Sequence, residues 1–102
     1  MKLNPITNGL PPIHPGEFLR ETLSDLDMTQ LAFAQAIDVS PMRISHVVNG
    51  SRPITAEMAL RLGCAFGQTP QYWLNLQNTY DLKIAETELK TSLRNIQELA
   101  VA

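Results

Sequence analysis

The sequence is short of cysteine and of long hydrophobic runs. Its 102 residues contain one cysteine, Cys64, which cannot form an internal disulfide and is typical of a reducing compartment. No stretch approaches the roughly 18 consecutive apolar residues that cross a membrane, and residues 1–12 lack the apolar core of a signal peptide. We therefore expect a cytoplasmic protein of one domain without a membrane segment.

Basic residues are also few. Eight Lys and Arg against ten Asp and Glu give a net charge of −2, which is unfavourable for binding a polyanion. The middle of the chain differs, because residues 28–62 carry three basic and two acidic side chains, with no acid between Asp38 and Glu57. Screening limits the reach of surface charges to about 8–10 Å, so this local balance matters more than the net charge. The acidic total weakens a DNA-binding role without excluding it.

Residue patterns for catalysis and metal binding are missing too. We find no nucleophile–base pair, carboxylate dyad or phosphate-binding loop, so we predict that the protein is not an enzyme and needs no cofactor. His14, His46 and Cys64 have no metal-ligand spacing and fall on different predicted elements, which argues against a metal site. We expect His14 at the start of a helix and Cys64 as a small buried residue.

Capping residues and prolines mark the ends of five predicted helices in an all-α chain. The helices are expected to begin near Pro15, to span residues 30–37 and 41–49, to run from Thr55 to Gly67, and to continue from Thr69–Pro70 into the tail. Residues 1–13, rich in Pro, Gly and Asn, are predicted to form a flexible arm. Tyr72 and Trp73 are expected in the core rather than stacked on bases.

The predicted helices at residues 30–37 and 41–49 are separated by only three residues. Two short helices joined by so short a turn cross steeply, as in a helix-turn-helix. Ala34 supplies the small residue that the crossing needs, and Leu31 and Ile37 are expected to face inward beside it.

The helix at 41–49 has two contrasting sides. At about 100° per residue, one side collects the apolar residues Ile44, Val47 and Val48. The opposite side collects Met42, Ser45, His46 and Asn49. Such a face is often merely solvated, but hydrogen-bonding side chains after a helix-turn-helix also suit base edges in a major groove. Ser40 and the free N–H groups at the helix start suit a phosphate.

Four segments resemble a known family. Residues 28–50, MTQLAFAQAIDVSPMRISHVVNG, resemble the lambda-repressor/Cro type of helix-turn-helix. HPGEFLRETL (14–23), NGSRPITAEMALRLGCAFG (49–67) and TPQYWLNLQNTYDL (69–82) are similar to the HigA antitoxins, also called VapI-like, which are DNA-binding partners of HigB toxins. The resemblance implies a homodimeric cytoplasmic repressor. It would bind double-stranded DNA at the operator of its own operon and neutralise a HigB-like mRNA-cleaving toxin. Because a two-fold dimer presents two reading helices, we expect that operator to be an inverted repeat.

The resemblance also implies roles for individual residues. The base-reading candidates are Gln30, Met42, Arg43 and His46. The phosphate or backbone candidates are Ser40, Ser45, Asn49 and Arg52. The chain departs from the wider class at Asp38, where glycine is favoured in the turn. Aspartate tolerates the left-handed conformation better than most residues, so we expect the turn to survive with some strain.

The tail lies outside the resemblance, so we predict three parts: the arm at 1–13, a DNA-binding domain at 14–82 and a helical tail at 83–102. Apolar residues recur along the tail at helical spacing: Leu82, Ala85, Leu89, Leu93, Ile96 and Ala100. This stripe either folds back on its own domain or stays exposed for a second copy or a toxin. Two other functions stay open, an orphan regulator without a toxin and a protein-only adaptor with a vestigial helix-turn-helix.

Overall fold

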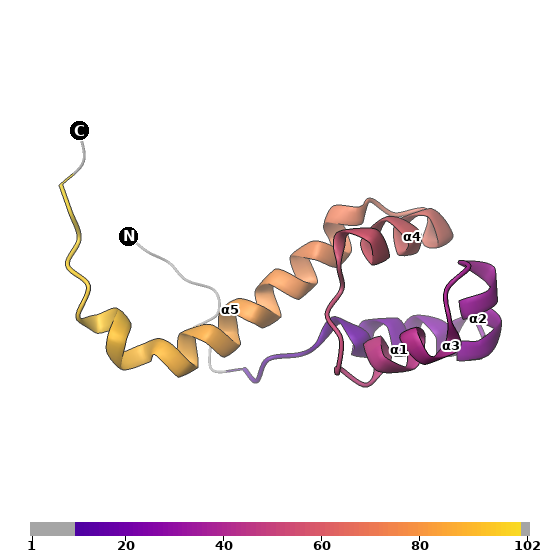
Figure 1. Ribbon diagram of the computed structural model, residues 1–102, viewed down its shortest axis with the longest axis horizontal. Coiled ribbons are helices and arrows are strands. Elements are labelled where there is room, and N and C mark those ends of the chain that lie inside the picture. The colour runs from indigo at the N-terminus through magenta and orange to yellow at the C-terminus, as the bar shows by residue number, and fades with distance from the viewer. Residues whose placement is uncertain (1–9, 101–102) are drawn as a thin grey trace.

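The computed structural model describes residues 10–100, and this part of the chain forms five helices and no strand (Figure 1). The helices are α1 (Pro15–Asp25), α2 (Gln30–Ala36), α3 (Pro41–Val48), α4 (Ala56–Phe66) and α5 (Pro70–Arg94). The all-α, five-helix prediction is confirmed, and the expected ends of α2 and α3 were each one residue too far along. Of the predicted arm, residues 10–13 are not helical, and residues 1–9 lie outside the described part.

Side chains cap the N-termini of four helices, α1 to α4. The Oγ atoms of Thr29, Ser40 and Thr55 accept hydrogen bonds from backbone N–H groups three residues later, at 3.0, 3.2 and 3.2 Å. His14 does the same for α1, because its Nδ1 accepts from the N–H of Gly16 at 2.9 Å. Each such bond satisfies a donor that the helix itself leaves unpaired. The expected helix starts therefore follow from local sequence.

Residues with a left-handed backbone follow the same four helices: Asp27 after α1, Asp38 after α2, Gly50 after α3 and Gly67 after α4. Gly50 and Gly67, the predicted stops, have φ of 80° and 67°, and Asp38 has φ of 60° as expected for the turn. After α2, the N–H of Val39 donates to the carbonyl of Ala34 at 3.0 Å. This is the helix-ending arrangement in which one residue reverses its hand and the next bonds back over the last turn. It directs the chain from α2 into α3.

The core lies where α1 to α4 meet the start of α5. It contains Leu19, Leu23, Phe33, Ala34, Ile37, Ile44, Val47, Val48, Ile54, Met58, Ala59, Leu62 and Trp73. Ala34 is fully buried, as the helix crossing requires. The expectation that Leu31 faces inward is wrong. It is 54% exposed because Phe33, Ala34 and Ile37 form the inward stripe of α2, and Leu31 lies beside that stripe.

The two aromatic residues at the start of α5 have different environments. Trp73 is buried in the core as predicted, beside Phe66, and its indole N–H donates to the Gln68 side chain at 2.8 Å. Tyr72, expected in the core, is exposed and contacts Trp73 edge-on. Neighbours in a helix are about 100° apart, so the face that buries Trp73 turns Tyr72 outward.

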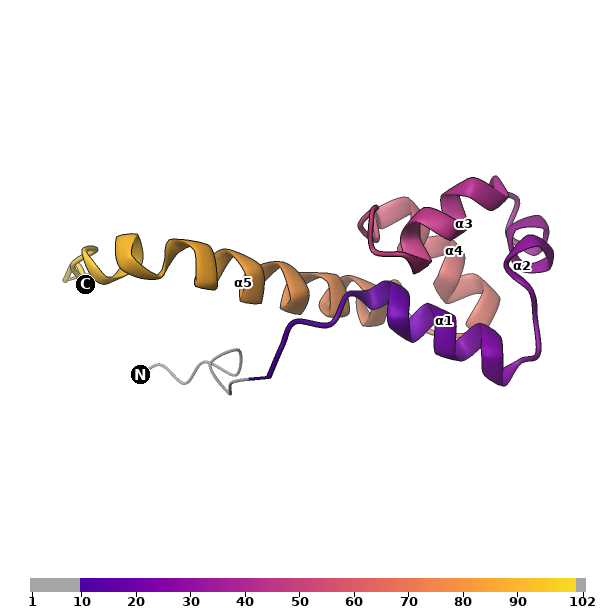
Figure 2. The ribbon, with the colours of Figure 1, turned by 90° about the horizontal axis from the view of Figure 1, so that it is seen from below.

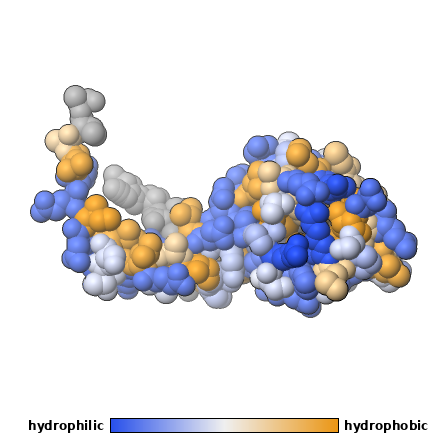
Figure 3. Space-filling model, viewed as in Figure 1, coloured by the Kyte–Doolittle hydropathy of each residue, from blue (hydrophilic) through white to orange (hydrophobic). Residues whose placement is uncertain are grey.

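Helix α5 begins in the core and then leaves it. Its first half packs on α4 and α1, and its second half projects from the globular end of the molecule (Figures 1 and 2). Leu89 and Leu93 are 47% and 44% exposed, and hydrophobic residues show along this projecting half in Figure 3. Leu89 and Leu93 therefore lie outside the core of the described residues. The helix ends at Arg94, so the expectation of helix through Ile96 and Ala100 is wrong.

No helix within residues 10–100 is long and apolar enough to cross a membrane.

Candidate nucleic-acid interface

Helix α3 presents the two faces that its sequence predicts. Ile44, Val47 and Val48 are buried against α1 and α2. On the opposite side Met42 is 66% exposed, Asn49 is exposed, and Ser45 and His46 are half-buried. The Asn49 amide donates to the Ser45 hydroxyl at 3.4 Å, so these two side chains form a small polar group near the end of the helix. The outward face can meet a ligand that enters along α3.

Two further candidate residues lie at helix starts. Gln30 is the first residue of α2 and is exposed. Ser40 is exposed before α3, where its Oγ accepts from the N–H of Arg43 and its hydroxyl proton remains available for donation. A donor beside the positive end of a helix suits an anionic oxygen.

Helix α1 supports α3 by a very close approach. A Cβ placed on Gly16 would lie 1.9 Å from the Val47 carbonyl oxygen and 3.0 Å from the Val48 Cα. Both are main-chain atoms, which cannot rotate away. Arg20 adds a long contact from α1, since its Nη2 lies 3.5 Å from the Val48 carbonyl. Glycine at position 16 therefore fixes how far α3 stands from α1.

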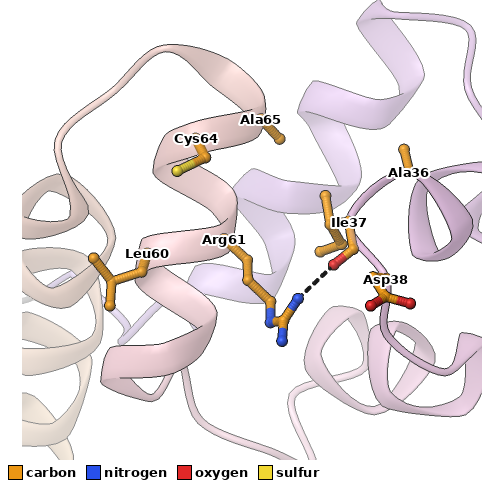
Figure 4. Close-up of a pocket in the computed structure, with 7 residues that line it drawn as sticks. All are labelled: Ala36, Ile37, Asp38, Leu60, Arg61, Cys64 and Ala65. Carbon is orange, nitrogen blue, oxygen red and sulfur yellow. Dashed lines mark hydrogen bonds between the residues drawn. The ribbon is translucent and has the colours of Figure 1, made fainter.

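Arg43 is not a free charge on α3, because α4 supplies a carboxylate to it. Its Nη2 and Nη1 donate to the two oxygens of Glu57 at 3.0 and 3.3 Å. Arg61 donates to the same carboxylate at 3.0 Å and to the carbonyl of Ile37 at 2.7 Å (Figure 4). The hydrogen bonds from Arg43 and Arg61 lower the pKa of Glu57 below its usual value. Sequence analysis missed this contact, because Glu57 bounds the acid-free stretch in sequence but lies against α3 in space.

Arg52 differs from the other two arginines of the middle segment. It is exposed on the loop after α3, and within residues 10–100 it forms no ion pair. The loop is held from behind by Gln77 of α5, whose buried Oε1 accepts from the N–H of Ile54 at 2.7 Å. Gln77 in turn donates to Asp81 at 2.9 Å. No sequence signal marks this contact, which joins residues 23 positions apart.

A buried histidine, His14, lies behind the same loop. The ring packs edge-on against Tyr80, and burial lowers its pKa below 6.5, an effect larger than the opposing hydrogen bond to the Arg52 backbone and the charges of Asp81 and Glu17. Protonation would also take away the Nδ1 lone pair that caps α1. The folded protein therefore favours the neutral ring.

We expect the free energy of unfolding to fall as the pH is lowered through about 6.5, because the unfolded chain takes up a proton on His14 before the folded chain does. Urea denaturation at a series of pH values measures this. His14→Asn keeps a capping acceptor but does not titrate, so its stability should vary less over the same range. Equal slopes for both proteins would show that another group dominates.

The environment of Cys64 differs from the one predicted. It is exposed, where a buried position was predicted, and lines a hollow between α2 and α4 with Leu60 and Ala36 (Figure 4). Across residues 10–100 the structure brings together no group of three or more His, Cys, Asp or Glu side chains that could hold a metal ion.

Comparisons with known proteins identify the fold. The family described as Helix-turn-helix matches residues 19–73, from α1 to the start of α5. Virulence-associated protein I of Dichelobacter nodosus is 45% identical over 88% of this chain and 93% of its own. The solved structure of a HigA-family addiction module antidote protein from Coxiella burnetii superimposes with a TM-score of 0.86 at 40% identity, over 88% of this chain and all of that one. The chain belongs to the HigA family of helix-turn-helix antitoxins.

A second HigA structure was solved together with promoter DNA. The Pseudomonas aeruginosa antitoxin HigA, solved with the higBA promoter, is 40% identical with a TM-score of 0.82, over 87% of this chain and 99% of that one. Membership of the HigA family confirms the resemblance found in the sequence and agrees with the expectation of a non-enzymatic regulator. The base and phosphate roles of individual residues stay predictions.

Proposed function

We propose that this HigA-family protein binds an inverted-repeat operator in its own promoter, represses that operon in the cytoplasm, and neutralises a HigB-like mRNA-cleaving toxin encoded beside it. The exposed polar face of α3 carries the proposal, because it belongs to the second helix of a helix-turn-helix and has an exposed capping serine, Ser40, at its start. The promoter complex of the Pseudomonas aeruginosa relative supports DNA as the ligand. A toxin is supported by the antidote role in the name of the Coxiella burnetii relative.

The proposal includes a two-fold dimer. One domain has few cations free for phosphate, since Arg43 and Arg61 both pair with Glu57. Two copies of α3 about 34 Å apart would reach successive major grooves and double the contacts. The exposed leucines of α5 suit a second copy or the toxin as partner.

Replacing Arg43 or Arg52 with alanine should impair DNA binding in two different ways. Arg43→Ala should cost roughly 1–3 kcal/mol of operator binding and relax the preference at one base position per half-site. Arg52→Ala, on the exposed loop, should weaken all DNA about equally and reduce the salt slope by roughly one per monomer. Fluorescence anisotropy against single-base operator variants at several salt concentrations measures both.

Lys90→Ala is the matched control for these variants, because it removes an exposed cation from the second half of α5, the part of that helix that projects from the globular end (Figure 1). It should leave affinity and preference nearly unchanged. Uniform losses for Arg43→Ala and Arg52→Ala, with unchanged base preference, would show that Arg43 contacts only the backbone. Absence of operator binding by the unaltered protein would refute the DNA-binding role.

A further inference from the structure

Glu57 is the centre of a network that reaches from α4 to α3 and to the turn before it. One of its oxygens accepts from Arg43, and the other accepts from Arg43 and Arg61. Arg61 also donates to the carbonyl of Ile37 at the end of α2. Isolated surface ion pairs contribute little, but a network with paired donors on one carboxylate has defined geometry. Arg43 is therefore held in one orientation before any ligand arrives.

The geometry of a guanidinium decides what this orientation leaves available. Glu57 takes the edge of Arg43 formed by its two terminal nitrogens. The other edge, which carries Nε–H and a second terminal N–H, has no hydrogen-bond partner within residues 10–100. Two parallel N–H groups in a fixed plane match the O6 and N7 acceptors of guanine. Arg43 can thus be held by Glu57 and present a two-donor edge to a base.

The negative charge of Glu57 also favours specific over non-specific DNA binding. Arg43, Arg52 and Glu57 line one hollow beside α3, so the carboxylate lies near Arg52, the proposed phosphate contact. A carboxylate there repels phosphate and offsets the attraction of Arg43 for any DNA sequence. It also limits the side-chain freedom that Arg43 would lose on binding.

We propose that Glu57 is a positioning residue for base recognition, which fixes the guanidinium of Arg43 so that its open edge reads a guanine in each half-site. The inference rests on the proposed function, because it requires α3 to enter the major groove of an operator. It adds a determinant of specificity on α4, outside the recognition helix. Its consequence is a higher ratio of operator binding to binding of unrelated DNA.

The test compares Arg43→Ala, Glu57→Gln and the double variant by measuring dissociation constants for the operator, its single-base variants and unrelated DNA. Glu57→Gln should lower the preference at the base that Arg43→Ala also affects, by about 5- to 20-fold, which is part of the value of a two-donor contact. It should bind unrelated DNA more tightly. If Glu57 acts through Arg43, the double variant should lose no more preference than Arg43→Ala alone.

Two further variants separate geometry from charge and from folding. Glu57→Asp keeps the charge but shortens the side chain by one methylene, so it should lose base preference without tighter binding to unrelated DNA. Glu17→Gln removes an exposed acid from the first turn of α1, as Glu57→Gln does from the first turn of α4, and should leave base preference unchanged. Thermal melting of each variant confirms that it is folded at the assay temperature.

The failures of the two proposals are distinguishable. If the unaltered protein prefers no DNA sequence, the proposed function fails and the role of Glu57 fails with it. If Arg43→Ala relaxes the preference while Glu57→Gln and Glu57→Asp keep it, only the role of Glu57 is overturned. It is overturned as well if Arg43→Ala keeps the preference, because there is then no reading arginine to position.

Discussion

Replacing Gly16 with alanine should lower the free energy of unfolding by about 2–4 kcal/mol, the upper range for an overpacked site. The added Cβ would lie 1.9 Å from the carbonyl oxygen of Val47 and 2.9 Å from its carbonyl carbon. Because these are backbone atoms, the strain can be relieved only by moving α1 away from α3. Urea denaturation of the unaltered protein and the variant measures the loss.

Gly67→Ala is the matched control for this prediction. Gly67 also has a left-handed backbone, with φ of 67°, but a Cβ there would have no described atom within 4 Å apart from its two chain neighbours. It should cost only about 1 kcal/mol, the conformational strain of a left-handed alanine. Equal losses for the two variants would mean that α1 and α3 are not in such close contact.

Gly16→Ala should also impair DNA binding at temperatures where this variant is still folded. Gly16 sets the separation of α1 from α3, so a displaced α3 would meet the groove at a changed depth and angle. We expect operator affinity to fall while binding to unrelated DNA changes less, because phosphate contacts tolerate small shifts better than base contacts do. Unchanged operator affinity in a folded Gly16→Ala variant would contradict this reasoning.

Removing the apolar stripe of α5 should separate dimerisation from folding. Deleting residues 83–102, or replacing both Leu89 and Leu93 with serine, should leave the helical domain stable, because these leucines are about half exposed and lie outside the core. Dimerisation or toxin binding should weaken. If a dimer is lost, operator affinity should fall by a factor on the order of 100 or more, since each half-site would then be bound independently.

Sedimentation velocity over a range of concentrations measures this effect, alongside circular dichroism to confirm the fold. The control Glu88→Ala/Thr91→Ala changes two exposed side chains on other faces of the same helical turns and should leave assembly unchanged. A truncated chain that unfolds would show that the stripe supports its own domain. A monomer at every concentration, bound to an operator without two-fold symmetry, would refute the dimer.

The sequence determined the helices and the faces of α3. Thr29, Ser40 and Thr55 cap N–H groups three residues away, and Gly67 ends α4 with its own left-handed backbone. These features depend on atoms within one or two helical turns, so residue type and spacing are enough to predict them. For the same reason the buried and outward sides of α3 were predicted correctly.

Only the tertiary structure decided which residues meet between helices. It paired Arg43 with Glu57 across 14 positions, joined Gln77 to Ile54 across 23, and left Cys64 exposed. Helical periodicity predicts which side chains share a face, but it does not say which other helix covers that face or at what angle. That depends on close approaches such as the one at Gly16, and on α5 leaving the core after its first half. The recognition helix was therefore readable from the sequence, whereas the carboxylate that holds its arginine was not.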